Sequence, residues 1–220
     1  MFYHLSLFPL NIVLFPGMPL TLHIFEERYK LMIRECITQR QPFGVVLIES
    51  GQEALGPLAH PHSVGCKARI AQVQQLAEGR MNLLVLGEER FRIQTLEHDR
   101  PYLAGTVEPF PLRDPRPEET AIVSQQLRPL LVAYLHLLSE AGNVEFDPTQ
   151  LPAEPVALAF LGAALLQAPP ERKQELLACE NATRMLTRMC SLLRQEMPLL
   201  RLMLQNEAGK LDSPGGFSPN

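Results

Sequence analysis

The first half of the chain alternates between apolar and polar residues in short runs, a pattern typical of β-strands with one buried face. The runs predict strands at 3–10, 20–25, 43–48, 64–74, 81–86, 91–96 and 102–110. Pro16-Gly17, Glu78-Gly79 and Gly87-Glu88-Glu89 separate neighbouring runs and predict turns. Six or seven short strands with such close turns indicate a closed or nearly closed antiparallel sheet, that is, a β-barrel.

One helix interrupts the predicted strands. Over about 26–40 the apolar residues recur at helical spacing: Tyr29, Met32, Ile33, Cys36 and Ile37. Glu26 and Glu27 fall in its first turn, where negative charge suits the helix dipole. We therefore expect an amphipathic helix that flanks the barrel.

The second half of the chain is patterned as helices. An apolar stripe covers 123–138, the segment 156–166 is apolar on nearly all sides, and a short helix is expected at 171–179. Asn181 can cap a last helix. Prolines crowd the segment before these helices, which predicts a semi-rigid linker. The expected α+β fold has a barrel at 1–112, a linker at 113–117, a helical bundle at 118–207 and a flexible tail at 208–220.

Composition narrows the class of protein. The chain has 220 residues, 46% of them apolar and 20% charged, as in an ordinary globular protein. A net charge of −4 argues against coating DNA or binding an anionic membrane. No apolar run reaches the roughly 18–20 residues of a membrane-spanning helix, and the N-terminus lacks the pattern of a signal peptide. Four scattered cysteines without a CxxC pair favour reduced thiols, so we expect a cytoplasmic protein.

Candidate catalytic and metal-binding chemistry is sparse. His60, His62 and Cys66 could offer three ligands from one loop, but zinc usually takes a fourth, so a polar loop is favoured and no metal or cofactor is expected. No nucleophile, base and oxyanion donor can be drawn together from the sequence. Arginines on the last helix are partly balanced by glutamates, which favours a solvated face over a nucleic-acid surface.

Several motifs, taken in order, carry a family resemblance. The opening ones are Phe8-Pro9-Leu10, Leu14-Phe15-Pro16-Gly17, His23-Ile24-Phe25-Glu26 and Arg28-Tyr29. They are followed by Ala68-Arg69-Ile70, Gly79-Arg80, Asn82-Leu83, and Gly87 with Arg90-Phe91-Arg92-Ile93. Over roughly residues 5–205 the chain resembles the N-terminal, substrate-binding domain of Lon proteases in its free-standing bacterial form. The resemblance implies a PUA-like β-barrel followed by a helical bundle.

Within these motifs, the residue types also predict local structure. Gly87 is expected to supply a turn, and Phe91 and Ile93 to point inward on the strand that follows. Arg90 and Arg92 are then expected to point outward or toward Glu88 or Glu89.

The modules that make Lon an enzyme have no counterpart in the sequence. It contains neither a GxxxxGK[ST] phosphate loop nor a GxSxG nucleophile elbow. By resemblance, the chain is therefore not expected to hydrolyse ATP or peptides by itself.

We expect instead a binding module for unfolded or extended polypeptide or for a protein partner, and the resemblance suggests protein quality control as its setting. The candidate contact residues lie in the first loop and on the neighbouring helix: Phe15, Pro16, Met18, Leu20, Tyr29 and Met32. Two alternatives stay open, an adaptor or regulator that docks through the C-terminal helices and an RNA-binding PUA-like protein. An enzyme acting in the cleft between barrel and bundle ranks below both.

Overall fold

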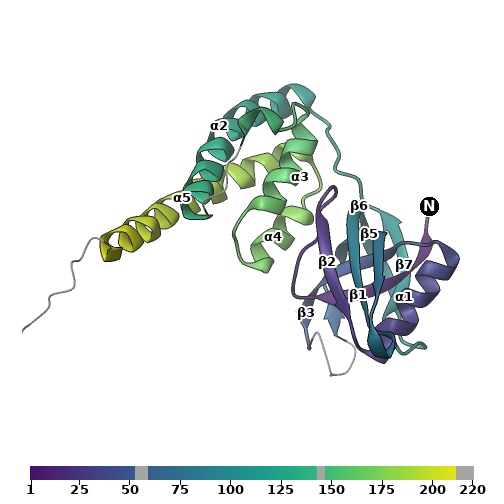
Figure 1. The fold of residues 1–220 in the computed structure, drawn as a ribbon. Coiled ribbons are helices and arrows are strands. Elements are labelled where there is room, and N and C mark those ends of the chain that lie inside the picture. The colour runs from purple at the N-terminus through teal and green to yellow at the C-terminus, as the bar shows by residue number, and fades with distance from the viewer. Residues whose placement is uncertain (53–58, 143–146, 212–220) are drawn as a thin grey trace, which may run out of the picture.

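The computed structural model describes residues 1–52, 59–142 and 147–211. Its strands are β1 (Tyr3–Leu10), β2 (Pro19–Ile24), β3 (Phe43–Ser50), β4 (His60–Pro61), β5 (Val64–Gln75), β6 (Met81–Glu97) and β7 (Ala104–Pro109). Its α-helices are α1 (Glu27–Gln39), α2 (Pro117–Gly142), α3 (Pro155–Leu165), α4 (Pro170–Leu177) and α5 (Ala182–Leu211). The expected α+β class, with strands first and helices after them, is confirmed (Figure 1).

The strands form one seven-stranded sheet that closes on itself. Its order is β1-β7-β6-β5-β3-β4, and β2 pairs with the first half of β6. A parallel pairing of Leu7–Leu10 in β1 with Gly44–Leu47 in β3 closes β1, β7, β6, β5 and β3 into a ring, and β4 extends from β3. The other strand pairs are antiparallel, as the short connections predicted.

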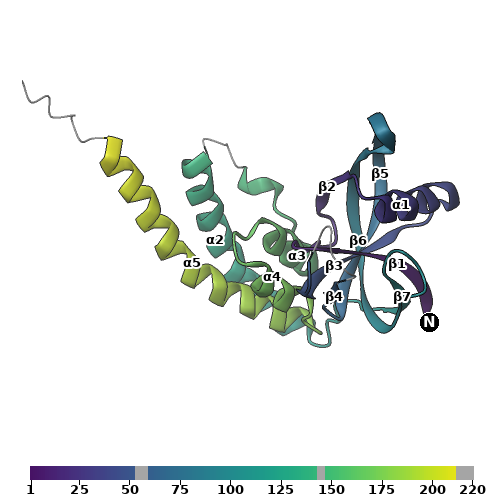
Figure 2. The ribbon, with the colours of Figure 1, turned by 90° about the horizontal axis from the view of Figure 1, so that it is seen from below.

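The helices form an elongated bundle on one side of the ring, and α1 lies on the side away from it (Figures 1 and 2). Helix α5 packs along α2 and extends beyond it. The backbone N–H of Arg184 donates to Asn181 Oδ1 at 2.9 Å, which confirms the expected cap. Helix α5 continues to Leu211, four residues into the segment predicted as a flexible tail, and the rest of that segment lies outside the described residues.

The predicted turn at Gly87-Glu88-Glu89 is wrong, because β6 runs through it as a single strand of 17 residues. The register shifts here, so that Gly87 lies opposite Ala68 and Arg90 opposite Cys66. The loop between β1 and β2 closes onto this point: the N–H of Gly87 donates to the Met18 carbonyl at 2.9 Å, and the N–H of Gly17 donates to the Gly87 carbonyl at 2.9 Å. A Cβ on Gly87 would lie 2.2 Å from the Phe15 carbonyl oxygen. Glycine is therefore required for close approach of two backbones rather than for a turn.

The ring and the bundle share a hydrophobic core. One cluster fills the ring beneath α1 and includes Met32, Ile33 and Phe43. A second cluster unites Phe15 and Val64 of the ring half with buried residues of all four bundle helices. The two halves therefore bury apolar surface against each other, which stabilises their association.

Gly87→Ala should lower the free energy of unfolding by about 2–3 kcal/mol, because the new methyl group forces the Phe15 backbone away from β6. Urea unfolding followed by circular dichroism measures this. Gly17→Ala is the control: Gly17 has φ of +80°, but a methyl group added there would have no atom within 4 Å, so its cost should stay near about 1 kcal/mol. Equal losses at the two positions would contradict the close-approach explanation.

Candidate functional site

An apolar groove of about 660 Å³ lies where the ring meets the bundle. One wall is the loop from Pro16 to Pro19 that leads into β2, and the other is helix α3. The α3 wall consists mainly of apolar side chains, including Val156, Phe160, Leu161 and Leu165.

The loop wall is held by a turn and by a buried ring. The N–H of Met18 donates to the Phe15 carbonyl at 3.0 Å, and Gly17 has φ of +80°. Proline followed by such a glycine is typical of a type II turn, so the predicted Pro16-Gly17 turn is confirmed. The Phe15 ring is fully buried in the shared core and anchors the turn, while Pro16 and Met18 remain half-buried at the groove.

The α3 wall is fixed at both of its ends. The side chain of Glu154 accepts hydrogen bonds from the N–H groups of Val156 and Ala157, and Pro155 occupies the first helical position. Just after the helix, the N–H of Gln167 donates to the Tyr134 hydroxyl oxygen at 2.7 Å. Because the Glu154 carboxylate is engaged in capping α3, it adds little polar character to the groove.

A buried arginine joins β6 to the bundle beside the groove. Arg90 of β6 is 2% exposed and donates two hydrogen bonds, to the carbonyl of Leu177 and to that of Cys179 at 2.7 Å. Its guanidinium also lies 4.7 Å from the Phe110 ring centroid and 5.7 Å from that of Phe160, which lines the groove. Burial lowers the pKa of Arg90 to about 10. The expectation that Arg90 points outward or toward Glu88 or Glu89 is therefore wrong.

A glutamine strengthens the same junction. Gln174 of α4 is buried, and its Nε2 donates to the Val64 carbonyl of β5 at 2.9 Å. Helix α4 is thus bound to two neighbouring strands of the ring through polar contacts that are shielded from water.

The structure distributes the six predicted contact residues over three places. Pro16 and Met18 line the groove. Leu20 lines a separate pocket of about 380 Å³ beside β2, and Tyr29 contributes to the floor of that pocket. Phe15 and Met32 are buried, so their side chains support the surface from inside and do not form an open contact face, and Tyr29 is also buried except where it lines that pocket.

Sequence reasoning missed the α3 wall. The signal was the segment 156–166, whose apolar character on nearly all sides is equally typical of a completely buried helix. In the structure Leu158 and Ala159 are buried, whereas Ala157 and Leu165 are exposed at the groove.

The candidate metal ligands between His60 and Cys66 do not converge on one site. His60 is exposed and pairs with Glu49 at 3.2 Å, whereas Cys66 faces the ring interior, where burial raises its thiol pKa to about 12. Within residues 1–52, 59–142 and 147–211, no group of three or more His, Cys, Asp or Glu side chains could hold a metal ion. Among the described helices, none combines the length and apolarity that crossing a membrane requires.

Comparison with known proteins gives one consistent result. The family model of the ATP-dependent protease La (LON) substrate-binding domain matches residues 4–195. Lon protease of Anaeromyxobacter dehalogenans is 26% identical over 95% of this chain, and Lon protease of Paraburkholderia phytofirmans is 30% identical over 87%. The chain spans about a quarter (24%) of the length of each of these two relatives.

Solved structures agree with the sequence relatives. A Lon N-terminal domain protein from Xanthomonas campestris aligns over 86% of this chain and 98% of its own, with a TM-score of 0.60 and 26% identity. The N-terminal domain of the Mycobacterium avium complex Lon protease aligns over 87% of this chain and 98% of its own, with a TM-score of 0.68. At 20% identity, the second alignment supports the fold alone.

Arg90→Ala should lower the free energy of unfolding by about 3 kcal/mol, because it leaves the Leu177 and Cys179 carbonyls buried without donors. Urea unfolding measures the loss. Arg92→Ala is the matched control: Arg92 is more exposed and pairs with Glu180 at 3.6 Å, so its loss should stay below about 1 kcal/mol. Similar losses for the two variants would show that the junction does not depend on Arg90.

Proposed function

Because the chain belongs to the family of ATP-dependent protease La (LON) substrate-binding domains, we propose that it binds extended or unfolded polypeptide in the groove between the Pro16–Pro19 loop and helix α3. A segment of this kind offers apolar side chains that a folded protein keeps inside. The groove exposes apolar surface, whose contact with water is unfavourable. Burying the two surfaces against each other supplies the binding free energy.

The apolar lining is the observation that supports this proposal. Among the described residues that line the groove, Glu154 alone carries a charge, and its carboxylate caps α3. Met18 adds a flexible, polarisable side chain that can adapt to different partners. Such a lining selects for apolar character and not for one sequence, as a binder of diverse unfolded segments requires.

In the proposed role, the chain binds polypeptide and does not catalyse its cleavage. The matched family is a substrate-binding domain, and the sequence contains neither the phosphate loop nor the nucleophile elbow described above. In this role the groove holds polypeptide, and cleavage belongs to another module.

A second candidate function uses a different surface. Helix α5 exposes Leu199, Leu202 and Met203, which lie three and four residues apart and so share one face of the helix. This apolar stripe supports docking of a protein partner through the C-terminal helices, as an adaptor would require.

Met18→Glu and Ala157→Glu should each weaken the binding of fluorescein-labelled reduced carboxymethylated lactalbumin at least tenfold. Each places a charge in the apolar groove. Ala157 is exposed, so its substitution leaves the core intact, whereas Met18 is half-buried and also packs against the core, so Ala157→Glu is the cleaner of the two variants. Fluorescence anisotropy measures the dissociation constants.

Leu31→Glu is the control for this experiment, because Leu31 is exposed on α1, away from the bundle. It should leave the affinity unchanged. Loss of binding in the control as well, or full binding by both groove variants, would refute the groove as the binding site.

The purified chain should neither turn over ATP nor cleave casein above the background of a mock purification. Phosphate release and gel electrophoresis measure the two activities. Activity that copurifies with the chain through several columns and changes on mutation of this chain would overturn the assignment.

A further inference from the structure

Strand β5 has a long edge without a strand partner. It pairs with β6 from Val64 to Gln75, whereas β3 pairs with it at Cys66, Lys67 and Ala68. From Arg69 to Gln75, the side turned away from β6 has no strand beside it in the described part of the chain. Seven residues of strand extend over roughly 23 Å, enough for a further strand to pair.

The end of α1 explains why the ladder stops there. Continuing the β3–β5 register would place Pro42 opposite Arg69 and Gln41 opposite Ile70. Pro42 has no N–H, and the N–H of Gln41 donates to the Cys36 carbonyl at 2.9 Å. Arg40, with φ of 53°, turns the chain at the end of the helix. Arg40 and Gln41 therefore close α1, and Pro42 cannot donate to β5, so the ladder ends at Ala68.

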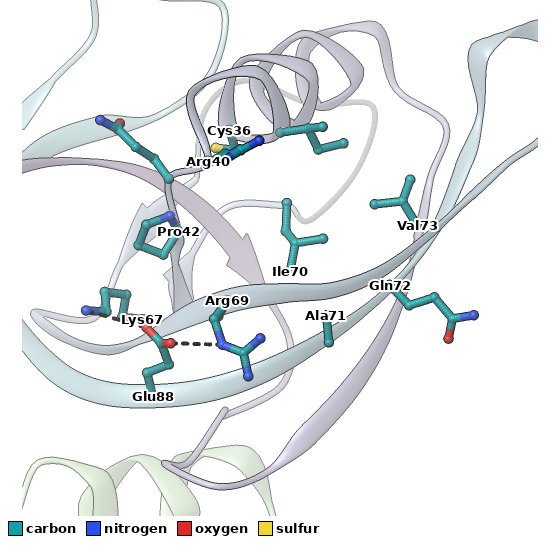
Figure 3. Close-up of a pocket in the computed structure, with 12 residues that line it drawn as sticks. Cys36, Arg40, Pro42, Lys67, Arg69, Ile70, Ala71, Gln72, Val73 and Glu88 are labelled. Atoms are coloured by element: carbon teal, nitrogen blue, oxygen red, sulfur yellow. Dashed lines mark ion pairs between the residues drawn. The ribbon is translucent and has the colours of Figure 1, made fainter.

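A pocket of about 570 Å³ occupies the space left between α1 and this edge (Figure 3). Ile70 and Val73 of β5 point toward α1. They share a side because the register shifts between Ile70 and Gln72, which makes Ala71 an extra residue. The pocket therefore offers apolar side chains on one face and a strand edge along its length.

The charges around the pocket are mostly positive. Arg40, Lys67 and Arg69 line it together with one carboxylate, that of Glu88. Arg69 lies 3.1 Å and Lys67 3.5 Å from Glu88, so this carboxylate is shared between two cations. Lys67 also pairs with the carboxylate of Glu89. Among the described residues, Arg40 has no ion-pair partner. The lining residues sum to +2, and Glu89, which pairs with Lys67, lowers the local sum to +1, in a chain whose net charge is −4.

We propose that this edge takes up an extended polypeptide segment bearing an acidic side chain. The segment adds as a strand to β5 between Arg69 and Gln75, places apolar side chains against Ile70 and Val73, and sets its carboxylate against Arg40. Backbone hydrogen bonds supply affinity in this mode, and the cation selects the acidic segment. The site is separate from the groove beside α3 and does not depend on it.

A charge-swap experiment tests the partner's chemistry. The probes are two labelled, capped peptides, Thr-Val-Glu-Val-Thr-Val and its counterpart with Lys in place of Glu. The Glu peptide should bind the native chain more tightly than the Lys peptide. Arg40→Glu should lower the affinity for the Glu peptide and raise the affinity for the Lys peptide, each roughly fivefold.

Two further variants are the controls for the charge-swap experiment. Arg40→Asn removes the charge with a residue that tolerates a left-handed backbone, so it should fold normally and give intermediate affinities. Arg201→Glu changes an exposed arginine on α5 and should alter neither affinity. Equal affinities for the two peptides, or no swap with Arg40→Glu, would overturn the proposal.

Backbone methylation tests strand addition itself. Two versions of the Glu peptide carry N-methyl groups on alternate residues, in opposite registers. Because a strand turns alternate N–H groups to opposite sides, one version should lose binding at least tenfold and the other should keep it. Equal effects in the two registers would show docking through side chains alone and would overturn strand addition.

Hydrogen exchange then locates the peptide and separates this site from the groove. Amides of 69–75 should gain protection when the Glu peptide binds, in native protein and in Met18→Glu alike. Protection confined to β2, or loss of peptide binding in Met18→Glu, would overturn the assignment to β5. Concentration-dependent dimerisation that protects the same amides without peptide would identify a second copy as the occupant and overturn it too.

Discussion

A buried cation joins the two halves of this protein. The guanidinium of Arg90 on β6 meets the carbonyls at the C-terminal end of α4, where the helix dipole is negative. Taking a charge out of water is costly, and these carbonyls and the neighbouring aromatic rings offset part of that cost, while Nε and Nη2 of Arg90 are buried without a hydrogen-bond partner among the described residues. Arginine suits the position better than lysine, because its planar group is more weakly hydrated and can stack on the neighbouring Phe110 ring while one of its nitrogens, Nη1, donates to both carbonyls. The ring and the bundle are thereby fixed in one arrangement, which nonspecific apolar contact alone would not select.

The same contact determines the shape of the groove. Phe160 faces Arg90 and also lines the groove, while the opposite wall is tied to β6 by the two backbone hydrogen bonds at Gly87. Both walls are therefore positioned from one strand, β6, within a stretch of four residues. A surface that binds unfolded chains can keep a defined width in this way while its lining remains adaptable.

Much of the fold could be predicted because its signals are local. Alternation predicted the strands, helical spacing predicted α1, and Asn181 and Pro16-Gly17 acted through neighbours in the chain. Gly87 and Arg90 could not be interpreted locally, since their roles depend on Phe15 and on Leu177, far away in sequence. The candidate site divides in the same way. The opening motifs of the family resemblance suggested Pro16 and Met18, whereas the α3 wall depends on which side of an apolar helix the bundle leaves uncovered.

Both proposed binding surfaces lie where the fold leaves an element incompletely covered. Such uncovered surfaces also favour unwanted association between copies of the chain. An open strand edge can pair with the same edge of another copy. Along β5, however, two copies would bring Arg40 and Arg69 of one molecule close to the same cations of the other. Positive charge therefore repels a second copy and attracts an acidic segment, so one feature protects the edge and gives it specificity.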